Sequence, residues 1–306
     1  NKKWPIEAVM HDILAGPMNH KYSAAYTLDV LEHIPQAEEG IFIENICKSL
    51  DEHGVLILGM PSLESQSYAS PQSIDGHINC KSGEDLAALM KKYFHKLKIT
   101  VIYNIIDKKF LQNIPNKNIN KIKKKYNLPD KFILTLGHQE KRKNFLRLIK
   151  AIDILKRDGE NVKLVIIGQK AGETEKIKNL IIKLRLNSNI RIFSNLDDFE
   201  VRCFYKLANL FIFPSIYEGF GIPILEAMAS NLPMVLSNTE VFREITQNKY
   251  SYFDPYDQLS IANRIKFVLL NKSIQKKMII YGKRRINYFS AKIQAKEINH
   301  LYNKII

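Results

Sequence analysis

Two glutamates and two glycines in one short stretch are the residues of this chain best suited to chemistry. Residues 213–229 contain Glu218, Gly219, Gly221 and, eight positions after the first glutamate, Glu226. Glycines let a phosphate approach the backbone closely, and a helix N-terminus offers N–H groups to an anion. Carboxylates accept hydrogen bonds from hydroxyl groups. The stretch therefore predicts a ligand that carries both a phosphate and sugar hydroxyls.

The elements around this stretch place it at one edge of a sheet. The apolar run 210–213 predicts a strand, and Pro223 suits the first turn of a helix. In an open parallel α/β sheet, ligands bind beyond the carboxyl ends of the strands. A strand–loop–helix unit with this composition thus predicts a ligand site in its loop.

From residue 131 onward, short apolar runs alternate with amphipathic segments. Such runs are typical of strands that are buried on both faces. The predicted strands are 132–136, 163–167, 190–193, 210–213, 234–236 and 251–253. The predicted helices between them are 144–156, 173–186, 199–208, 224–230 and 242–246, and helices 258–270, 273–289 and 292–304 follow. The alternation predicts an α/β fold with a Rossmann-like, doubly wound parallel sheet.

The run from Glu218 through Gly219, Phe220, Gly221 and Pro223 to Glu226-Ala227-Met228 resembles the Glu-x7-Glu motif of the family 4 glycosyltransferases. Supporting matches lie at residues 104–107, 137 with 141–144, 168 and 253–257. Residues 100–306 thus resemble the C-terminal, donor-binding domain of these retaining enzymes of GT-B fold. The resemblance implies a nucleotide-sugar donor, a glycan or lipid-linked acceptor and a role in surface polysaccharide assembly, with no cofactor.

The resemblance also implies roles for individual residues. Glu226 would hold the ribose hydroxyls, and Glu218 would contact the donor sugar or steady the charge near its anomeric carbon. Arg142 and Lys143 would neutralise the leaving phosphate, since a planar guanidinium fork and a compact ammonium both bind phosphate oxygens. The remaining donor-binding positions are Gly137, Gly168, Gly219, Phe220 and Gly221. This half shows no cluster of metal-binding carboxylates, so no metal is expected.

Each assignment has a simpler alternative. Glu226 could complement a helix dipole, and Glu218 could be an exposed loop carboxylate. Arg142 and Lys143 could be plain surface cations, since Lys141 beside them shows how common basic residues are here. The glycines could serve only tight turns.

Residues 1–99 carry a second pattern of α/β alternation, in which a strand ends near residues 9–12 and others span 24–28 and 55–58. Helices are predicted at 39–50 and at 86–94, the latter with Ser82 as a plausible N-cap. The sequence Asp29-Val30-Leu31-Glu32-His33-Ile34 resembles the class I S-adenosylmethionine-dependent methyltransferases, as do residues 53–57 and 76–79. By this resemblance Asp12 would lie near the adenine and Asp29 near the cofactor pocket.

The first strand and the glycine-rich cofactor loop of that methyltransferase family are absent from the sequence, so we expect an incomplete methyltransferase-like segment. His11, His33 and His77 are expected to make hydrogen bonds at helix ends or in loops. A predicted strand at 96–103 joins the two parts, which we divide between residues 99 and 100. S-adenosylmethionine would be a cofactor only if the first segment were functional. Besides a glycosyltransferase, two alternatives remain: an inert nucleotide-sugar-binding remnant, and a bifunctional methyltransferase–glycosyltransferase.

Composition limits the classes of partner. The net charge is +15, but the basic residues are spread over many predicted helices, which favours solvated helix faces. Peripheral binding to a membrane surface is the alternative, and no nucleic-acid recognition motif is present. The three cysteines follow no metal-ligand or redox spacing. With no signal pattern and no apolar run of membrane-spanning length, we expect a cytoplasmic chain, either free or at the inner face of the membrane.

Overall fold

A computed structural model describes residues 7–68, 71–97 and 102–305. The chain divides into two compact units. Unit 1 comprises Asn1–Val101 together with Ile298–Ile306, and unit 2 comprises Ile102–Glu297. The sequence prediction placed the division after residue 99, two residues before the change from unit 1 to unit 2. Each unit is described by itself.

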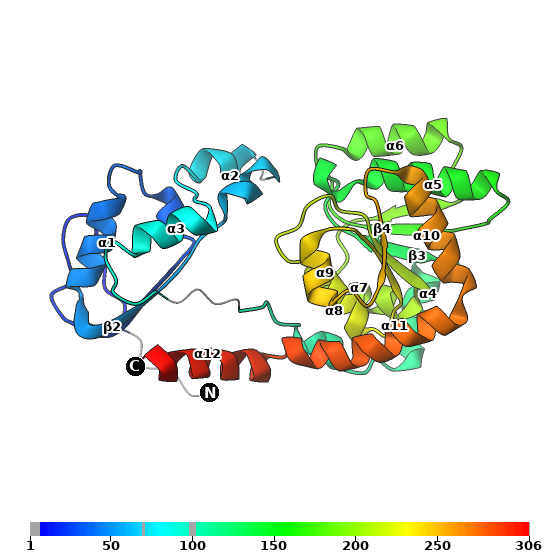
Figure 1. Ribbon diagram of the computed structural model, residues 1–306. Helices are drawn as coiled ribbons and strands as arrows, with labels where there is room; N and C mark the ends of the chain where they lie inside the picture. The colour runs from blue at the N-terminus through cyan, green and yellow to red at the C-terminus, as the bar shows by residue number, and fades with distance from the viewer. Residues whose placement is uncertain (1–6, 69–70, 98–101, 306) are drawn as a thin grey trace. The chain divides into compact units, whose positions relative to one another are not determined.

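Unit 2 is built on a six-stranded sheet in the order β5-β4-β3-β6-β7-β8, in which every pair of neighbours is parallel (Figure 1). The strands are β3 (Ile133–Leu136), β4 (Leu164–Ile167), β5 (Ile190–Phe193), β6 (Leu210–Phe213), β7 (Met234–Ser237) and β8 (Ser251–Phe253). From β3 the chain moves outward to β4 and β5, then returns to form β6 on the other side of β3. The sheet therefore changes direction between β3 and β6, and ligands bind at such a switch point.

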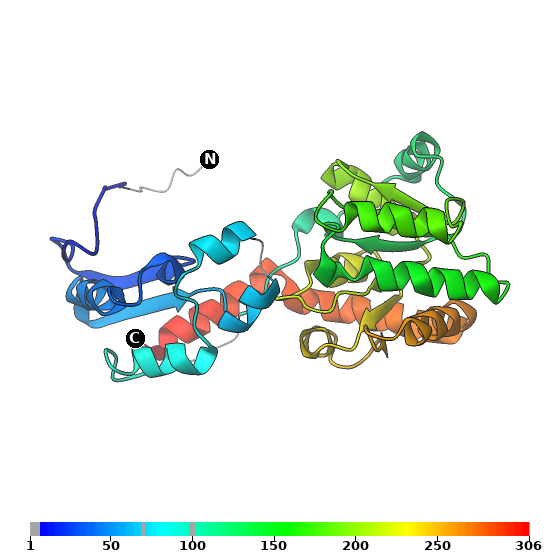
Figure 2. The ribbon, with the colours of Figure 1, turned by 90° about the horizontal axis from the view of Figure 1, so that it is seen from above.

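Helices cover both faces of this sheet. They are α4 (Asn116–Lys125), α5 (Phe145–Arg157), α6 (Thr174–Lys183), α7 (Asp198–Leu207), α8 (Ile222–Ala229), α9 (Glu240–Thr246), α10 (Gln258–Leu270) and α11 (Lys272–Arg285). The last helix, α12 (Ala291–Ile305), begins in unit 2, and its residues from Ile298 onward belong to unit 1. Helix α5 contacts α6 and α10, while α4 contacts α7 and α8 contacts α11. Figures 1 and 2 show α5 and α6 side by side. Helices α5 and α6 connect the strands on one side of the switch point, whereas α8 and α9 connect those on the other side. Right-handed crossovers in opposite directions place these two pairs on opposite faces of the sheet, which confirms the predicted doubly wound α/β fold.

The predicted elements of unit 2 all form, and their ends move by a few residues at most. Helix α7 shows why: Asp197 accepts a hydrogen bond from the backbone N–H of Glu200, whose side chain accepts one from the N–H of Asp197, a complete capping box. The strands are fully apolar or nearly so, and β4, β6 and β7 are buried along their whole length. Continuous burial explains why short apolar runs without alternation were reliable strand signals.

Unit 1 has a smaller sheet of two parallel strands, β1 (Tyr22–Leu28) and β2 (Leu50–Gly59). The 3₁₀ helix η1 (Leu31–His33) and helix α1 (Glu39–Lys48) connect them, and the 3₁₀ helix η2 (Leu63–Tyr68), α2 (Pro71–Gly76) and α3 (Gly83–Met90) follow β2. Leu31, Phe42 and Ile43 lie at the centre of its core. The predicted cap is confirmed, because the Ser82 side chain accepts a hydrogen bond from the N–H of Asp85.

Two predictions for the first hundred residues need correction. No strand forms at residues 9–12, where Asp12 instead accepts a hydrogen bond from the N–H of Leu14 in a turn. The predicted strand at 96–103 includes residues 98–101, which lie outside the described residues, and residues 96, 97, 102 and 103 are irregular. Residues 9–12 end in His11 and Asp12, so they form no continuous apolar run, and no described strand pairs with them.

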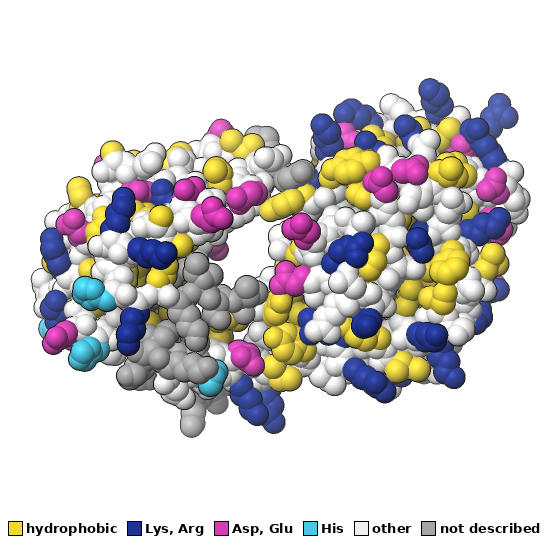
Figure 3. Space-filling model, viewed as in Figure 1, with side chains coloured by type: hydrophobic (Ala, Val, Ile, Leu, Met, Phe, Trp, Pro, Cys, Tyr) yellow, Lys and Arg dark blue, Asp and Glu magenta, His cyan; other side chains and the backbone are white. Residues whose placement is uncertain are grey.

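The positive charge does not gather into one patch on the face drawn in Figure 3, where Lys and Arg side chains are scattered among apolar and acidic ones. This distribution is that of solvated helix faces. In the part of the chain that the structure describes, none of the helices combines the length and the apolar character that crossing a bilayer would require.

Candidate functional site

The candidate site lies where β3 and β6 end, at the switch point of the unit 2 sheet. Gly137 follows β3 directly, and the 3₁₀ helix η4 (Lys141–Lys143) brings two cations to the same edge. The loop after β6 carries Glu218. The two loops are joined by a backbone hydrogen bond from the N–H of Ile216 to the carbonyl of Arg142, 2.8 Å long. This bond helps to hold Arg142 and Glu218, which are 76 positions apart in the sequence, at the carboxyl ends of two adjacent strands.

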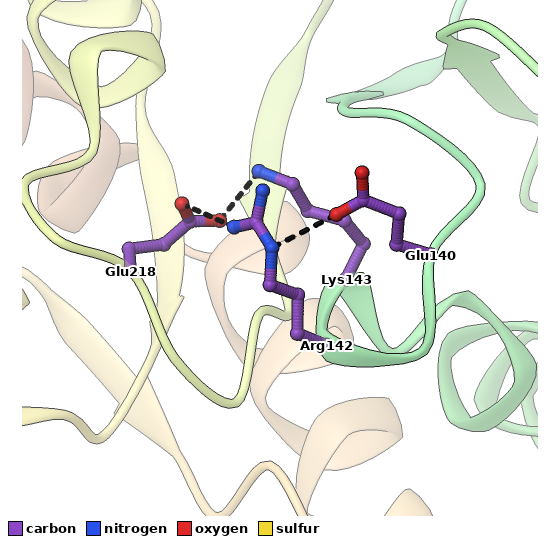
Figure 4. A network of polar contacts seen from close by, with 4 residues as sticks. All are labelled: Glu140, Arg142, Lys143 and Glu218. Atoms are coloured by element: carbon purple, nitrogen blue, oxygen red, sulfur yellow. Dashed lines mark hydrogen bonds and ion pairs between the residues drawn. The ribbon is translucent and has the colours of Figure 1, made fainter. Parts of the chain in front are cut away.

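Glu218 accepts hydrogen bonds from both predicted cations (Figure 4). Its Oε1 lies 2.6 Å from Lys143 Nζ, and its Oε2 lies 2.9 Å from Arg142 Nη1. The Nε of Arg142 donates to Oε2 of Glu140 at 2.9 Å. Four side chains thus form one chain of ion pairs with two positive and two negative groups. A site of this kind is already neutral, so its cations are positioned before any ligand arrives.

Burial separates this cluster from surface ion pairs. The side chains of Lys143 and Glu218 are 9% and 10% exposed, and that of Arg142 is 24% exposed. Burial lowers the pKa of Lys143, and the adjacent Glu218 carboxylate opposes that shift. Lys141, by contrast, is exposed. The alternatives that made Glu218 an exposed carboxylate and Lys143 a plain surface cation are therefore wrong.

Two of the predicted glycines shape the floor beneath Lys143. Gly137 has φ +148°, and a Cβ there would come within 2.8 Å of Lys143 Cδ, so the lysine stem lies directly over the glycine. A Cβ on Gly168 would lie 1.7 Å from the carbonyl oxygen of Gly137. The loops after β3 and β4 are packed backbone against backbone, which only glycine permits. These glycines position Lys143 as well as turning the chain.

Two further residues belong to the site: Asn144, noted above only as part of the supporting match at 141–144, and Glu140, which no motif indicated. Asn144 has φ +59° and donates from Nδ2 to the carbonyls of Pro214 (3.0 Å) and Pro255 (2.7 Å). It is buried and ties together the loops after β3, β6 and β8. An asparagine just before a helix is a known left-handed residue, but nothing in the sequence indicates which loops it joins. For Glu140 a signal did exist in the sequence, because a glutamate two positions before Arg142 is close enough to pair with it.

The glycine turn ahead of α8 is only partly required by geometry. Gly221 is the N-cap with φ +105°, and a Cβ there would meet Phe242 at 3.1 Å. A Cβ on Gly219 would meet nothing within 4 Å. The Phe220 ring lies half-buried against Tyr103 and Phe289, with centroids 6.1 and 6.0 Å apart. Gly221 is thus structural, whereas the space beside Gly219 is open.

Glu226 lies on α8 and accepts a hydrogen bond of 2.7 Å from the hydroxyl of Tyr205, a fully buried side chain of α7. Burial raises the pKa of Glu226 to about 7, with the Tyr205 hydrogen bond opposing and Asp198 and Asp107 adding to the rise. Glu226 lies beyond the first turn of α8. Since the dipole effect is confined to that turn, the dipole alternative for Glu226 has no support here.

The two positions of unit 1 that the methyltransferase resemblance singled out are not brought together. Asp12 is exposed and caps its own turn, and Asp29 is exposed with φ +54°. The N–H of Asp29 donates to the carbonyl of Gly59 at 2.9 Å, which continues the pairing of β1 with β2. The cofactor role of Asp12 and Asp29 remains a prediction.

Comparison with known proteins gives relatives for the part of the chain that holds the candidate site. The chain is 31% identical over 170 residues to the O-antigen chain mannosyltransferase RfbU of Salmonella typhimurium, covering 55% of this chain and 44% of that protein. It is 29% identical over 193 residues to the capsular polysaccharide biosynthesis glycosyltransferase CapM of Staphylococcus aureus, covering 61% of this chain and 50% of that one. The chain therefore spans half or less of the length of these curated relatives.

Solved structures share the fold. A glycosyltransferase from Rickettsia africae superposes with a TM-score of 0.68 at 19% identity, covering 92% of this chain and 76% of that one. Anabaena HepE in complex with UDP superposes with a TM-score of 0.63 at 16% identity, covering 92% of this chain and 72% of that one. The family model of the glycosyl transferases group 1 matches residues 116–285, which include every residue of the cation cluster. The chain belongs to the glycosyl transferases group 1 family.

Proposed function

We propose that this chain is part of a glycosyltransferase that moves a sugar from a nucleotide-sugar donor to a glycan or lipid-linked acceptor, with retention at the anomeric carbon. The observation that carries the proposal is the ion-paired group of Arg142, Lys143 and Glu218 at the switch point between β3 and β6. A ligand-binding edge, one buried and one half-buried cation and a carboxylate suit a sugar diphosphate.

The chemistry assigns a task to each cation. Cleavage of the bond between the sugar and the diphosphate develops negative charge on the leaving oxygen, and fixed positive groups stabilise it without reorganisation. Arg142 offers two N–H groups in one plane, and Lys143 offers a compact charge that burial has partly stripped of water. The diphosphate oxygens would accept the hydrogen bonds that Arg142 and Lys143 donate to Glu218 in the ligand-free chain. The displaced carboxylate would then face the sugar and its developing positive charge.

Glu226 is proposed to accept hydrogen bonds from the ribose hydroxyls. Its pKa of about 7 means that the ligand-free side chain titrates near neutral pH. Two ribose hydroxyls would stabilise the carboxylate form, because they donate to it. Donor binding should therefore release a proton from Glu226 when the solution is slightly acidic. The open space beside Gly219 and the half-buried Phe220 would border the donor.

The relatives narrow the donor and the setting. The Salmonella typhimurium relative is an O-antigen chain mannosyltransferase, and the Staphylococcus aureus relative is a capsular polysaccharide biosynthesis glycosyltransferase. We therefore place a nucleoside diphosphate mannose first among donors and surface polysaccharide assembly first among pathways. A lipid-linked acceptor would bring the chain to the inner face of the membrane from the cytoplasm. We expect sugar transfer to need no added cofactor.

The deciding experiment measures release of nucleoside diphosphate and sugar transfer with a panel of nucleotide sugars that includes GDP-mannose and UDP-glucose. We expect one donor to support transfer that Lys143→Met abolishes and that the matched surface variant Lys141→Met leaves intact. If a nucleotide sugar of the panel binds but its sugar is transferred to no acceptor, the result would support the inert-remnant alternative instead. Calorimetry with S-adenosylmethionine tests the bifunctional alternative, which requires measurable heat.

A further inference from the structure

The side chain of Glu32 is a deeply buried carboxylate of unit 1. Glu32 in η1 is 0% exposed, and both of its carboxylate oxygens lack a hydrogen-bond partner among the residues that the structure describes. An ionised carboxylate that is buried without a donor or counter-charge costs several kcal/mol. A bound cation would remove that cost, so the groups that face Glu32 decide whether a cation could be held there.

Two histidines face Glu32. His33 follows it in η1, and His77 follows α2, and one ligand atom from each of the three residues lies within 4.8 Å of the other two. The Nε2 of His33 is 3.9 Å from Oε1 of Glu32, and the two imidazole rings meet edge to face with centroids 5.0 Å apart. Two ligands around one zinc ion at roughly 2 Å each are about 3.3 Å apart. The ligand atoms of Glu32, His33 and His77 lie within 4.8 Å of one another, so small side-chain movements would bring them to that distance.

The surrounding contacts already orient these side chains. Nδ1 of His33 lies 2.7 Å from the carbonyl oxygen of Gly76, and a carbonyl only accepts, so Nδ1 carries the proton and Nε2 keeps its lone pair. Metal-binding histidines are commonly oriented by such a bond. The amide of Gln66 lies 3.3 Å from Nδ1 of His77. The N–H of Asn79 donates to the carbonyl of Glu32 at 3.0 Å, which fastens the His77 loop to η1.

We propose that Glu32, His33 and His77 bind a divalent transition-metal ion, with Zn²⁺ as the first candidate. Two imidazoles and one carboxylate form the ligand set of open zinc and iron sites, whereas closed structural sites use four protein ligands. The His33 side chain is 48% exposed, so an ion has a route from solvent. The remaining coordination positions would take water or an anionic oxygen of a ligand. The site departs from our sequence-based expectation that the chain holds no metal and that these histidines only make hydrogen bonds.

Calorimetric titration of the EDTA-treated full chain with ZnCl2 tests the proposal. We expect one ion per chain with a dissociation constant in the micromolar range or below. Glu32→Gln, His33→Ala and His77→Ala should each weaken binding at least tenfold. His53→Ala, which removes an exposed histidine of β2 from the same unit, is the matched control and should bind like the parent. No binding by the parent, or equal binding by the three ligand variants, overturns the site.

A second readout keeps the test decisive if a histidine variant folds poorly. Glu32→Gln keeps the shape of the side chain and removes its charge, so its metal-free form should melt no lower than the parent. Added Zn²⁺ should raise the melting temperature of the parent and leave that of Glu32→Gln unchanged. The same rise in both proteins would show that the ion binds elsewhere, and this outcome is independent of whether the chain transfers sugar.

Discussion

Two buried carboxylates, one in each unit, differ in what surrounds them. Glu218 of unit 2 is 10% exposed and accepts from Arg142 and Lys143, whereas Glu32 of unit 1 is fully buried and its oxygens accept from no described residue. In unit 2 the positive charges of Arg142 and Lys143 are therefore paired with carboxylates before a ligand binds. Unit 1 places two imidazoles beside a carboxylate that accepts a hydrogen bond from no described residue.

Because the two carboxylates have different partners, the two regions prefer different kinds of ligand. A neutral, preformed group of two cations and two anions suits a ligand that exchanges one anion for another, such as a diphosphate. An unpartnered carboxylate beside two histidines suits a ligand that supplies positive charge. The four predictions that follow test this contrast.

Replacing Lys143 should have the largest effect. Lys143→Met leaves Glu218 with one of its two partners and removes a charge from the leaving diphosphate, so we expect the transfer rate to fall roughly 10²–10³-fold. Steady-state rates with the best donor provide the measurement. Lys141→Met, an exposed neighbour, is the control. A loss of less than tenfold would remove Lys143 from the catalytic group.

A methyl group at Gly168 should destabilise unit 2. Its Cβ would lie 1.7 Å from the carbonyl oxygen of Gly137, so the backbone must move, and we expect Gly168→Ala to lower the free energy of unfolding by about 3 kcal/mol. Gly83→Ala in unit 1, where a Cβ would meet nothing within 4 Å, should change stability by less than about 0.5 kcal/mol. Urea unfolding of both variants checks the difference, and equal effects would contradict the close packing at the switch point.

The two buried carboxylates should respond oppositely to neutralisation. Glu218→Gln leaves Arg142 and Lys143 close together without their shared anion, so we expect a loss of about 2 kcal/mol of unfolding free energy. Glu32→Gln removes an unpartnered charge, and the metal-free chain should gain about 1 kcal/mol. Denaturant unfolding at pH 7 with EDTA present measures both. Changes of the same sign would break the contrast between the units.

Glu226 should give the chain a modest pH dependence. Its folded pKa of about 7 exceeds its ordinary value of 4.5, so the folded chain binds more protons between these values. Its contribution to stability is fully present below pH 4.5 and is lost as pH rises to about 7. We expect the parent to lose on the order of 1 kcal/mol relative to Glu226→Gln across this window. Parallel unfolding curves for both proteins from pH 5 to pH 8 would show that the side chain does not titrate there.

Sequence patterns predicted much of unit 2 and less of unit 1. The strands 190–193 and 210–213 were both predicted to the residue. Residues 210–213 show the reason most clearly, because a strand buried on both faces reads as an unbroken apolar run. In unit 1 the strand expected near residues 9–12 does not form. With only two strands and a small core, local apolar character there does not ensure pairing.

The amino-acid sequence is sufficient to predict the alternation of strands and helices, the family, and Arg142, Lys143 and Glu218 as candidates. The contacts between distant residues depend on the fold: Glu218 binds both cations, Asn144 joins three loops, and Glu32 lies beside His77. The spacing of residue types along the chain fixes which side chains lie on each face of a single helix or strand. The order of strands and the crossing of loops fix which distant side chains meet, and whether each buried charge finds a partner.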